Sequence, residues 1–515
     1  MKVLLLSMPD SFEHTPALTM RMPNGALASL AGNAGPGHDV FVADLILVQA
    51  AVAPTVARLM REIDPDVVGL SIMTFQRRTA FRLIRLIRSI KPEVVVVAGG
   101  YDPSLATDVY EPNSSGVDFV VRGEGALTFR ALLRAVSARE DVSTIPGLSF
   151  RGADGRFVHT PARGVSHLDG DEIELPNRAA RVLQGYTFLG RPIDIVETSR
   201  GCTYDCSFCS IIEMRGRNFH TFDFTRVLAD ISDARARGAR AIFLVDDNIT
   251  LNVARFEGLC RAIVDAGLND IHYIVQAMTS SIASHGATLA PLMRRANFRY
   301  VFLGIENILE HDLAFLHASA KNAQREGGRR VGNATLDAIQ VLHREGLNVV
   351  GGIIVGNPDD TRESIEANLA FAREYVDWPY IQHPTPYPGT PMTKDFVERN
   401  LIVNDRVEEY DGTTAVVRTA HLSADEIEFL RWRAERWMKA RHMPNALRHY
   451  PWYVLKNAPR MLAHTFRGST WRSALGLESE RDVFRRYKAH RAAEREYVPE
   501  LPAAHENHAP AYGMS

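Results

Sequence analysis

Three of the four cysteines in this 515-residue chain lie within eight positions, in the stretch SRGCTYDCSFCS (residues 199–210). Cys202, Cys206 and Cys209 follow the spacing C-x3-C-x2-C. A structural zinc site takes four ligands, usually in two close pairs, and a redox C-x-x-C pair would leave Cys202 without a role. Four cysteines normally hold a cubane iron–sulfur cluster, so three thiolates would leave one iron open to a small molecule. The spacing therefore favours a catalytic [4Fe-4S] cluster.

The cysteines come directly after the first of six β-rich runs, which stretches with helical spacing separate from one another. The runs are IDIVE, RAIFLVDD, IHYIVQ, RYVFLGIE, NVVGGIIVG and YIQHPTPYPG. Six consecutive β/α units predict a partial (β/α)6 barrel over residues 191–395. In barrels the loops that follow the strands carry the chemistry, which is where the cysteines stand.

An earlier β/α series occupies residues 1–140, with β-rich runs at KVLLL, HDVFVADL, DVVGLSI, EVVVVAGG and VDFVV. Strands that alternate with helices predict an open, doubly wound parallel sheet, so the chain is of the α/β class. Ligands of such sheets bind outside the carboxyl ends of the strands, and the glycines there let the backbone approach a large flat ligand closely. Those ends carry SIMTFQ (71–76), GGYDPS (99–104) and RGEGA (122–126).

The remaining segments are a connector, a helical domain and a tail. Residues 141–190 contain RGADGRF, which is typical of a hairpin turn. Strand signals vanish after residue 396, and we expect a helical C-terminal domain over residues 396–497, followed by a tail over 498–515. Cys260 lies on the apolar face of an apparent helix and is expected to be a small core residue.

Composition restricts the class of protein. A formal net charge of −2 gives no overall bias toward nucleic acid, and 46% hydrophobic with 23% charged residues is ordinary for a globular protein. Four cysteines are too few for a disulfide framework. The apolar run Val3–Leu6 is too short for a secretory signal, and no stretch approaches the ~20 apolar residues of a membrane span. We therefore expect a cytoplasmic protein.

With the aromatic Phe208 before its last cysteine, the C-x3-C-x2-C stretch resembles the signature of radical S-adenosylmethionine enzymes. In that family the open iron binds the amino and carboxylate groups of S-adenosylmethionine. Reductive cleavage then gives a 5′-deoxyadenosyl radical, which abstracts hydrogen from an unactivated C–H bond. The resemblance implies that Cys202, Cys206 and Cys209 ligate the cluster, that Phe208 adjoins the cofactor, and that a flavodoxin- or ferredoxin-type protein donates electrons.

Later strand endings resemble the family's cofactor loops. FLVDDN ends the second strand of the barrel, where the family contacts the methionine amino group, and this implies roles for Asp246 and Asp247. The commonest family ending there is Gly-Gly-Glu-Pro, and this chain has Val-Asp-Asp-Asn instead. LGIEN and GGIIVGNP end the fourth and fifth strands, where ribose and adenine lie, which implies contacts from Glu306, Gly352 and Gly356.

The N-terminal sheet resembles the cobalamin-binding module found in one subgroup of that family. VVVVAGGYDPSL and VVRGEGALTFRALL match the module's fourth and fifth strand endings. The cobalt-ligating Asp-x-His-x-x-Gly motif is missing, as is usual in the subgroup, so water or a side chain of SIMTFQ would take the lower face of cobalt. A degenerate module without a corrinoid is the alternative. The implied cobalamin contacts are Ser71, Thr74, Gly99, Gly100 and Glu124.

Four of the five tryptophans, namely Trp432, Trp437, Trp452 and Trp471, lie in a basic stretch over residues 431–472. Basic and aromatic residues together occur at membrane surfaces and nucleic-acid sites, and also on solvated helices. The arrangement looks similar to the C-terminal helices of cobalamin radical methylases that act on polycyclic lipids. This similarity implies a lipid-like substrate and peripheral membrane contact.

Together the resemblances imply a cobalamin-dependent radical S-adenosylmethionine methyltransferase that methylates an unactivated carbon of a small molecule. One S-adenosylmethionine would methylate the cobalamin, and a second would generate the substrate radical. A cyclase or rearrangement enzyme would use the same cofactors without methyl transfer. A non-catalytic iron–sulfur regulator that binds nucleic acid would explain the basic stretch, but we expect no nucleic-acid partner because the barrel strands end in apparent ligand loops.

Overall fold

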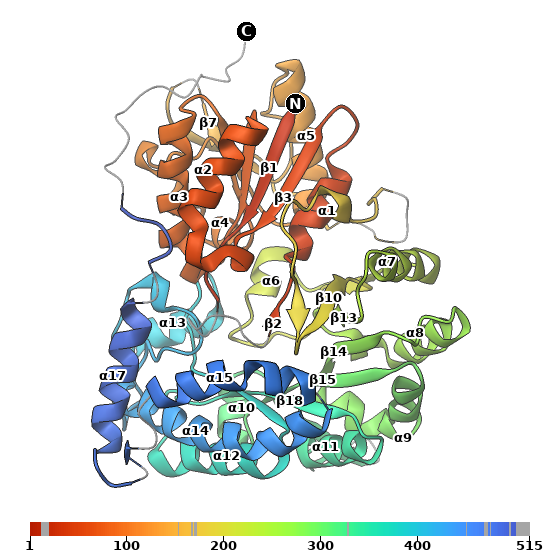
Figure 1. The fold of residues 1–515 in the computed structure, drawn as a ribbon, viewed down its shortest axis with the longest axis vertical. Helices are drawn as coiled ribbons and strands as arrows, with labels where there is room; N and C mark the ends of the chain where they lie inside the picture. Colours follow the sequence, from red (N-terminus) through yellow and green to blue (C-terminus); the bar gives the residue numbers. More distant parts are fainter. Residues whose placement is uncertain are drawn as a thin grey trace.

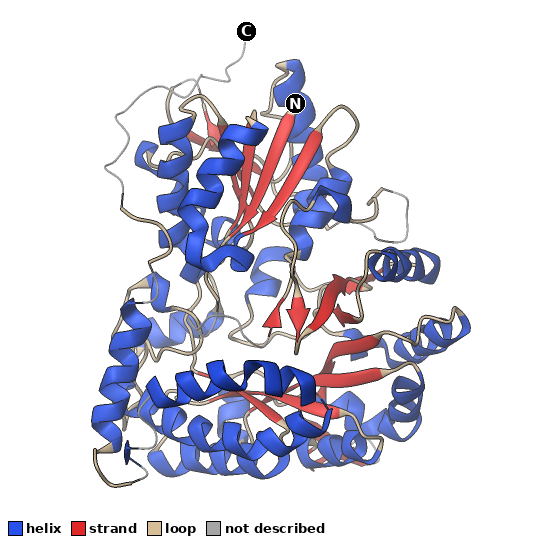
Figure 2. Ribbon diagram, viewed as in Figure 1, coloured by secondary structure: helices blue, strands red, loops and turns tan. Residues whose placement is uncertain are grey.

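The computed structural model describes residues 1–11, 20–152, 154–165, 168, 172–326, 329–449, 451–467, 472–473, 475–493 and 496–500. Figure 1 shows two α/β units stacked along the long axis, the N-terminal sheet above and a curved second sheet below, with the C-terminal helices packed beside the second sheet. Figure 2 shows that helices cover both faces of the N-terminal sheet and the outer face of the curved sheet.

The N-terminal sheet has the strand order β3-β1-β4-β5-β6-β7-β8, in which the first five strands are parallel. Because β1 lies between β3 and β4, the order reverses at β1/β4, and that reversal is where ligands of such sheets bind. The strands are β1 (Lys2–Ser7), β3 (Asp39–Asp44), β4 (Val67–Ser71), β5 (Val95–Gly99), β6 (Phe119–Val121), β7 (Leu148–Arg151) and β8 (Phe157–His159).

Alternating residues of the parallel strands fill two separate cores. Leu4 and Leu6 of β1 pack under one pair of helices, whereas Val3 and Leu5 pack under the other pair. Continuous apolar strands buried on both faces are typical of parallel sheets. The predicted doubly wound sheet is confirmed. The helices are α2 (Val52–Ile63) and α3 (Arg77–Ile90) on one face and α1 (Gly25–Asn33) and α5 (Gly125–Ala138) on the other.

The second sheet contains the six predicted barrel strands, parallel and in sequence order. It curves without closing in Figure 1, so the predicted partial barrel is confirmed. The strands are β10 (Arg191–Val196), β13 (Ala241–Leu244), β14 (His272–Met278), β15 (Phe298–Glu306), β18 (Asn348–Ile354) and β19 (Trp378–Gln382). The helices are α7 (Phe224–Ala236), α8 (Val253–Asp265), α9 (Thr279–Arg295), α10 (Glu310–Phe315), α11 (Thr335–Arg344), α12 (Arg362–Tyr375) and α13 (Pro391–Glu398).

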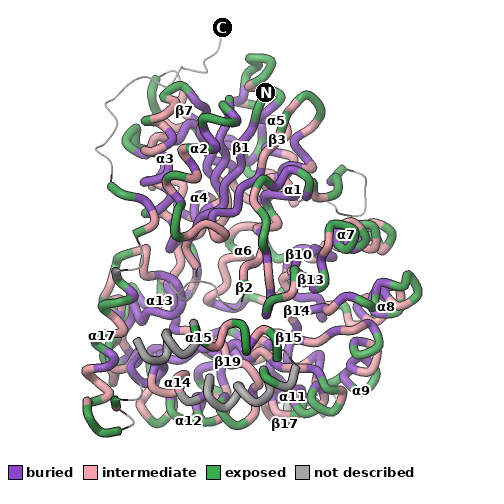
Figure 3. Tube along the Cα trace, viewed as in Figure 1, coloured by how far each residue is buried: buried purple, intermediate pink, exposed green. Residues whose placement is uncertain are grey.

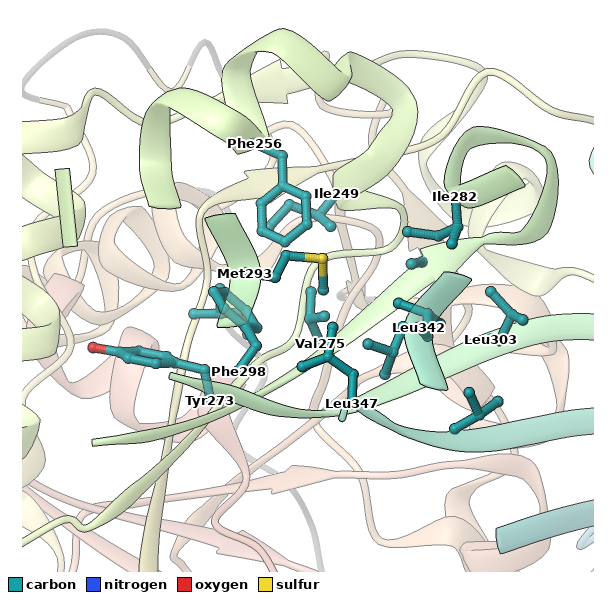
Figure 4. Packing of buried hydrophobic residues seen from close by; sticks show 14 of the residues in the cluster. Ile249, Phe256, Tyr273, Val275, Ile282, Met293, Phe298, Leu303, Leu342 and Leu347 are labelled. Atoms are coloured by element: carbon teal, nitrogen blue, oxygen red, sulfur yellow. The ribbon is translucent and has the colours of Figure 1, made fainter. Parts of the chain in front are cut away.

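The largest core lies between this sheet and its outer helices. Figure 4 shows Phe256 of α8 against Phe298 of β15, and their ring centroids lie 5.4 Å apart in an edge-on arrangement. Met293 of α9 and Leu342 of α11 fill the space beside them. Cys260 is part of this core, as expected. Each fully buried side chain of this size contributes roughly 1.5–3 kcal/mol, so this layer holds the strand ends in fixed positions.

Strands of the predicted connector pair with both sheets. The turn predicted at RGADGRF lies between β7 and β8; β7 pairs with β6 and β8 with β7, so both extend the N-terminal sheet. On the second sheet, β9 (Thr187–Phe188) pairs with β10, and β2 (Met20–Arg21) adds to β9 as the edge strand. The N-terminal segment therefore contributes a strand to the half-barrel. The predicted boundaries at residues 140 and 190 stay predictions.

The C-terminal helices pack on the half-barrel through one face of α14. Ile427, Leu430 and Met438 are buried in the barrel core. Arg491 forms ion pairs with Asp411 and Glu428, with the closest atoms 3.2 and 3.4 Å apart, which fixes α17 beside α14. The helices are α14 (Ala424–His449), α15 (Pro451–Arg467) and α17 (Glu480–Ala493). Figure 3 shows that the exposed segments lie mostly on outer helices and loops.

The basic, aromatic stretch is only partly described. Trp432 packs against Phe484, Trp452 is 82% exposed, and the side chain of Trp437 and the whole of Trp471 lie outside the described residues. Of the predicted tail, Val498 is buried against the N-terminal sheet, and residues 501–515 lie outside the described residues. Among the helices that the structure describes, none has the length and hydropathy of a membrane span.

Candidate active site where the two sheets meet

The cysteine loop begins where β10 ends. A short antiparallel pair, β11 (Ser199–Arg200) with β12 (His220–Thr221), forms its base, and Cys209 is the N-cap of helix α6 (Ser210–Arg215). Gly201 has φ +89°, and a Cβ there would lie 2.4 Å from the backbone oxygen of Asn218, so only glycine fits before the first cysteine. Cys206 is buried, while Cys202 and Cys209 are half-buried.

The three sulfurs are spaced too widely for a single ion. In the described part of the chain, the only group of at least three potential ligands within 4.8 Å of one another is an unrelated set of one histidine and two aspartates. Two thiolates on one zinc, with Zn–S bonds of about 2.3 Å, would lie about 4 Å apart. The spacing of Cys202, Cys206 and Cys209 therefore fits a multi-iron cluster better than a zinc ion.

A buried lysine supplies positive charge beside these thiols. Burial raises the pKa of Cys206 to about 12, and the positive charge of Lys321 opposes this shift. Burial alone would lower the pKa of Lys321, but Glu306 and the cysteines outweigh it and raise that pKa, so the ammonium keeps its charge. Lys321 Nζ donates to Glu306 Oε1 over 2.8 Å. Thiolates in a dry site need such a counter-charge.

Glu306 has a strained backbone conformation. Its φ is +58°, which is unfavourable for a residue other than glycine, and it lies at an irregularity in the β15–β18 pairing. A Cβ on Gly304 would come within 2.8 Å of Glu306 Oε1. Strain of this kind persists where the surroundings determine the conformation, often at functional sites. The predicted residue Glu306 thus lies with Lys321 beside the cysteines.

The two aspartates of the second strand ending, VDDN, bind different parts of the chain. Asp246 is wholly buried and accepts from the backbone N–H and hydroxyl of Thr198 and the hydroxyl of Ser199, at 2.5–2.7 Å. Burial raises the pKa of Asp246 to about 6. Both of its oxygens thus bind the β10 ending. Asp247 accepts from the backbone N–H of Gly201 at 2.7 Å and therefore holds the start of the cysteine loop.

Asn248 contacts one of the cysteine sulfurs. Its Nδ2 lies 3.9 Å from Cys202 Sγ and 3.9 Å from Met278 Sδ. The FLVDDN stretch indicated that this strand ending belongs to the site, but roles were predicted only for Asp246 and Asp247 and not for Asn248. Lys321 carried no signal in the sequence, since it lies in a loop, HASAKNAQ, that belongs to no strand end or recognised motif.

The N-terminal sheet directs its carboxyl edge at the cysteine loop. Figure 1 shows its strands running toward α6 with α4 (Tyr101–Leu105) at their ends, and α4 packs on α6. Burial raises the pKa of Tyr101 to about 12, and Arg215, Asp247 and Cys209 are the charged groups that act on it. Tyr101, which follows the predicted glycine pair, therefore links the two sheets.

The glycine pair lets neighbouring strand ends cross closely. Gly100 has φ +102°, and a Cβ there would lie 2.8 Å from the backbone oxygen of Ile72. The backbone N–H of Ile72 donates to the carbonyl of Gly99 at 2.9 Å, and that of Asp102 donates to the carbonyl of Ile72 at 3.1 Å. A larger residue would separate these two loops.

The other predicted cobalamin contacts lie along the same edge. Ser71 ends β4 and accepts from Asn24 Nδ2 at 3.3 Å, and Thr74 begins a buried single turn after it. Glu124, the N-cap of α5, lies 3.9 Å from Arg200 in the base of the cysteine loop. Hydroxyls, backbone groups and closely spaced glycines at the point where strand order reverses fit a large polar ligand such as cobalamin.

Three predicted contacts pack against protein groups. A Cβ on Gly352 would meet the Phe302 ring at 3.0 Å, and one on Gly356 would meet Ile427 of α14 at 2.9 Å. Phe208 packs with the apolar cluster around Phe396 of α13. Close packing accounts for the two glycines and for the position of Phe208, and their contact with a cofactor stays a prediction.

Comparisons with known proteins match both sheets. The family model described as the B12 binding domain matches residues 20–133, and the model described as the radical SAM superfamily matches residues 196–372. An uncharacterised methyltransferase of Pyrococcus horikoshii is 28% identical over 432 residues, which cover 84% of this chain and 90% of that protein.

Two further relatives have defined names. Hopanoid C-3 methylase of Methylococcus capsulatus is 27% identical, over 69% of this chain and 64% of that protein. The anaerobic magnesium-protoporphyrin IX monomethyl ester cyclase of Rubrivivax gelatinosus is 26% identical, over 78% of this chain and 73% of that enzyme.

Solved structures share the fold. The radical S-adenosylmethionine methyltransferase TsrM from Kitasatospora setae, with cobalamin and a [4Fe-4S] cluster bound, superposes with a TM-score of 0.61 at 20% identity, over 78% of this chain and 79% of that chain. OxsB, with aqua-cobalamin and S-adenosylmethionine bound, gives 0.64 at 16% identity, over 96% and 71%. Because the B12-binding match falls on the N-terminal sheet and the radical SAM match on the half-barrel, the chain belongs to the radical S-adenosylmethionine enzymes with an N-terminal cobalamin-binding domain.

Proposed function

We propose that this protein is a cobalamin-dependent radical S-adenosylmethionine methyltransferase that methylates an unactivated carbon of a small molecule. The observation that carries the proposal is the contact of the two sheets, in which α4, at the carboxyl edge of the first, packs on α6 of the cysteine loop. Half-buried Tyr101 of α4 lies close enough to Arg215 and Cys209 to feel their charge. Relatives named as methyltransferases or methylases, including hopanoid C-3 methylase, support the reaction type.

When bound, the cluster and S-adenosylmethionine supply a radical that activates the substrate carbon, and cobalamin supplies the methyl group. The chain contributes binding and orientation. Cys202, Cys206 and Cys209 would hold the cluster, and Lys321 balances the negative charge of the thiolates. Glu306 fixes Lys321 through the 2.8 Å hydrogen bond. The burial of Cys206 limits the access of water to the space where reactive species form.

Asp246 and Asp247 act as positioning residues in this proposal. Asp246 binds both Thr198 and Ser199, and Asp247 holds Gly201, so together they fix the loop between β10 and the first cysteine. Asn248 of the same strand ending lies 3.9 Å from Cys202 Sγ through its Nδ2. We expect it to contact the methionine part of S-adenosylmethionine.

The decisive experiment is anaerobic reconstitution with iron, sulfide, reductant, cobalamin and S-adenosylmethionine carrying a labelled methyl group. An extract of the native host serves as the substrate pool. We expect 5′-deoxyadenosine, S-adenosylhomocysteine and a labelled product that requires cobalamin. Formation of 5′-deoxyadenosine without any labelled product would instead support cyclisation or rearrangement, the second candidate, which the similarity to the Rubrivivax cyclase favours. No 5′-deoxyadenosine at all would exclude both.

A lipid-like substrate and contact with a membrane surface are the finer parts of the proposal. Leu447 at the end of α14 and Trp452 and Leu455 at the start of α15 are exposed large apolar side chains in the basic stretch. Such groups partition into the headgroup region of anionic membranes. Flotation with anionic liposomes tests this contact, and Trp452→Ala should reduce co-migration. If the wild-type protein does not float, the idea is wrong.

We also propose that a flavodoxin- or ferredoxin-type protein reduces the cluster in the cytoplasm. The scarcity of cysteine and the oxygen sensitivity of such clusters fit a reducing compartment. Replacing the chemical reductant with a purified flavodoxin system should sustain 5′-deoxyadenosine formation. Failure of every flavodoxin and ferredoxin of the host to do so would contradict this proposal.

A further inference from the structure

A second group of ligand-type side chains lies beyond the ends of β15 and β18, apart from the cysteines. His311 and Asp312 belong to α10, and Asp360 lies in the loop after β18. One ligand atom from each of these residues lies within 4.8 Å of the others. Asp312 and Asp360 are buried, while the His311 side chain is 58% exposed, so an ion would reach the group from solvent on that side.

The two carboxylates lie close together and have no basic partner of full charge, and burial, followed by the neighbouring Asp360, raises the pKa of Asp312 to about 8. Asp360 accepts from the backbone N–H groups of Gly356 and Asn357, at 2.8 Å each, and from the hydroxyl of Ser364. Asp312 Oδ1 lies 3.5 Å from His311 Nε2. Within the described ranges, no lysine or arginine forms an ion pair with either carboxylate.

Two buried oxygens in this group lack a donor. Asp312 Oδ2 has no hydrogen-bond partner, and neither has Asn357 Oδ1, although Asn357 is wholly buried and its side chain lies against Asp312. Buried acceptors without a donor are rare and costly in folded proteins. A buried carboxylate oxygen without a donor, beside a second carboxylate and an imidazole, is what a cation would satisfy.

We propose that His311, Asp312 and Asp360 bind one divalent cation through an imidazole nitrogen and carboxylate oxygens. A single nitrogen with several oxygens suits Mn²⁺ or Zn²⁺. The cation would join α10 to the loop after β18, two segments that follow the fourth and fifth barrel strands. Asn307 Nδ2, which donates to the carbonyl of Ile354 at 3.0 Å, already begins this connection next to Glu306.

The test uses the full-length protein with its iron–sulfur cluster reconstituted and oxidised, so that the cysteines are occupied and the cluster gives no interfering signal. After treatment with a chelator, Mn²⁺ is titrated in and the free ion is followed by its electron paramagnetic resonance signal. We expect one bound Mn²⁺ per chain, displaced by Zn²⁺. Asp312→Asn should weaken binding at least tenfold.

Two further variants make the result specific. His311→Gln changes an exposed side chain, so the fold should persist, and it should also weaken Mn²⁺ binding tenfold. Asp359→Asn is the matched control, because Asp359 is the exposed neighbour that pairs with Arg399 at 2.5 Å, and it should bind Mn²⁺ like the wild type. The proposal is overturned if the wild type binds neither metal, or if His311→Gln and Asp312→Asn bind as tightly as Asp359→Asn.

Discussion

The carboxyl edge of the N-terminal sheet faces the cysteine loop of the half-barrel, and the two edges offer a ligand different kinds of groups. The half-barrel presents the three cysteines and the charged Lys321–Glu306 pair, and the Asp246 and Asp247 carboxylates hold the loop that carries the cysteines. The N-terminal sheet presents backbone, with Gly100 in a left-handed conformation against Ile72. The half-barrel edge would bind its ligand through charged groups, and the N-terminal edge through close approach of the backbone. Substitutions at the two edges should therefore affect activity and stability differently.

The largest effect is expected from the charged edge. Cys202→Ala, Cys206→Ala and Cys209→Ala should each abolish the visible absorbance of the reconstituted cluster and the formation of 5′-deoxyadenosine. Cys260→Ala, in the core of α8, is the control and should keep both. If any of the first three variants still formed 5′-deoxyadenosine, the assignment of that cysteine as a cluster ligand would be wrong.

That charged edge was only partly predictable from the sequence. The cysteine spacing and the strand endings fixed the positions of Asp247 and Glu306, because ordered strands bring their endings to one side of the sheet. Lys321 and Asn248 were missed. Lys321 reaches the thiols from a loop after α10, and no periodicity marks a loop residue whose partner is fifteen positions away.

The backbone edge was predictable as a fold and less so as a site. Alternating apolar runs fixed the doubly wound sheet, and the glycine pair at residues 99 and 100 indicated a close approach. The role of Tyr101 depends on α4 packing against α6, a tertiary contact between segments about a hundred residues apart. Local sequence carries no record of such a contact.

A second prediction measures how far charge governs the first edge. Lys321→Met removes a positive charge beside the cluster ligands while keeping a long side chain, so the reduction potential of the cluster should fall. A unit charge at about 7 Å, at an effective dielectric constant of about 20, corresponds to a shift on the order of 100 mV. Potentiometric titration followed by electron paramagnetic resonance measures it.

Lys321→Arg is the matched control, since it keeps the charge, and its potential should stay close to that of the wild type. If Lys321→Met leaves the potential unchanged, the lysine does not balance the thiolates.

The contact between the edges gives the third prediction. Tyr101→Ala should lower the ratio of methylated product to 5′-deoxyadenosine roughly tenfold. A displaced N-terminal sheet would misorient the cobalamin relative to the substrate, whereas radical formation at the half-barrel would suffer less. Tyr101→Phe keeps the ring and should keep most of that ratio. Equal losses of both products in Tyr101→Ala would mean that the residue supports only the cysteine loop.

The smallest effect is expected from the backbone edge, and it appears as stability. Gly100→Ala combines a left-handed φ with a 2.8 Å approach to the Ile72 oxygen and should cost about 3 kcal/mol. Gly37→Ala has φ +83° but nothing within 4 Å, so it should cost only about 1 kcal/mol. Thermal unfolding of both variants separates the cost of conformation from that of close approach. Equal midpoints would show that closeness plays no part.

The pairing of β2 with β9 has a practical consequence for protein engineering. Residues 20 and 21 complete the edge of the half-barrel although they precede most of the N-terminal sheet in the chain. A shortened protein that starts after the cobalamin-type module would leave the outer edge of β9 unpaired and open to aggregation, although β9 would still pair with β10. Swapping modules between relatives should therefore transplant this two-residue strand together with the catalytic half, grafted ahead of it or replaced by a designed edge.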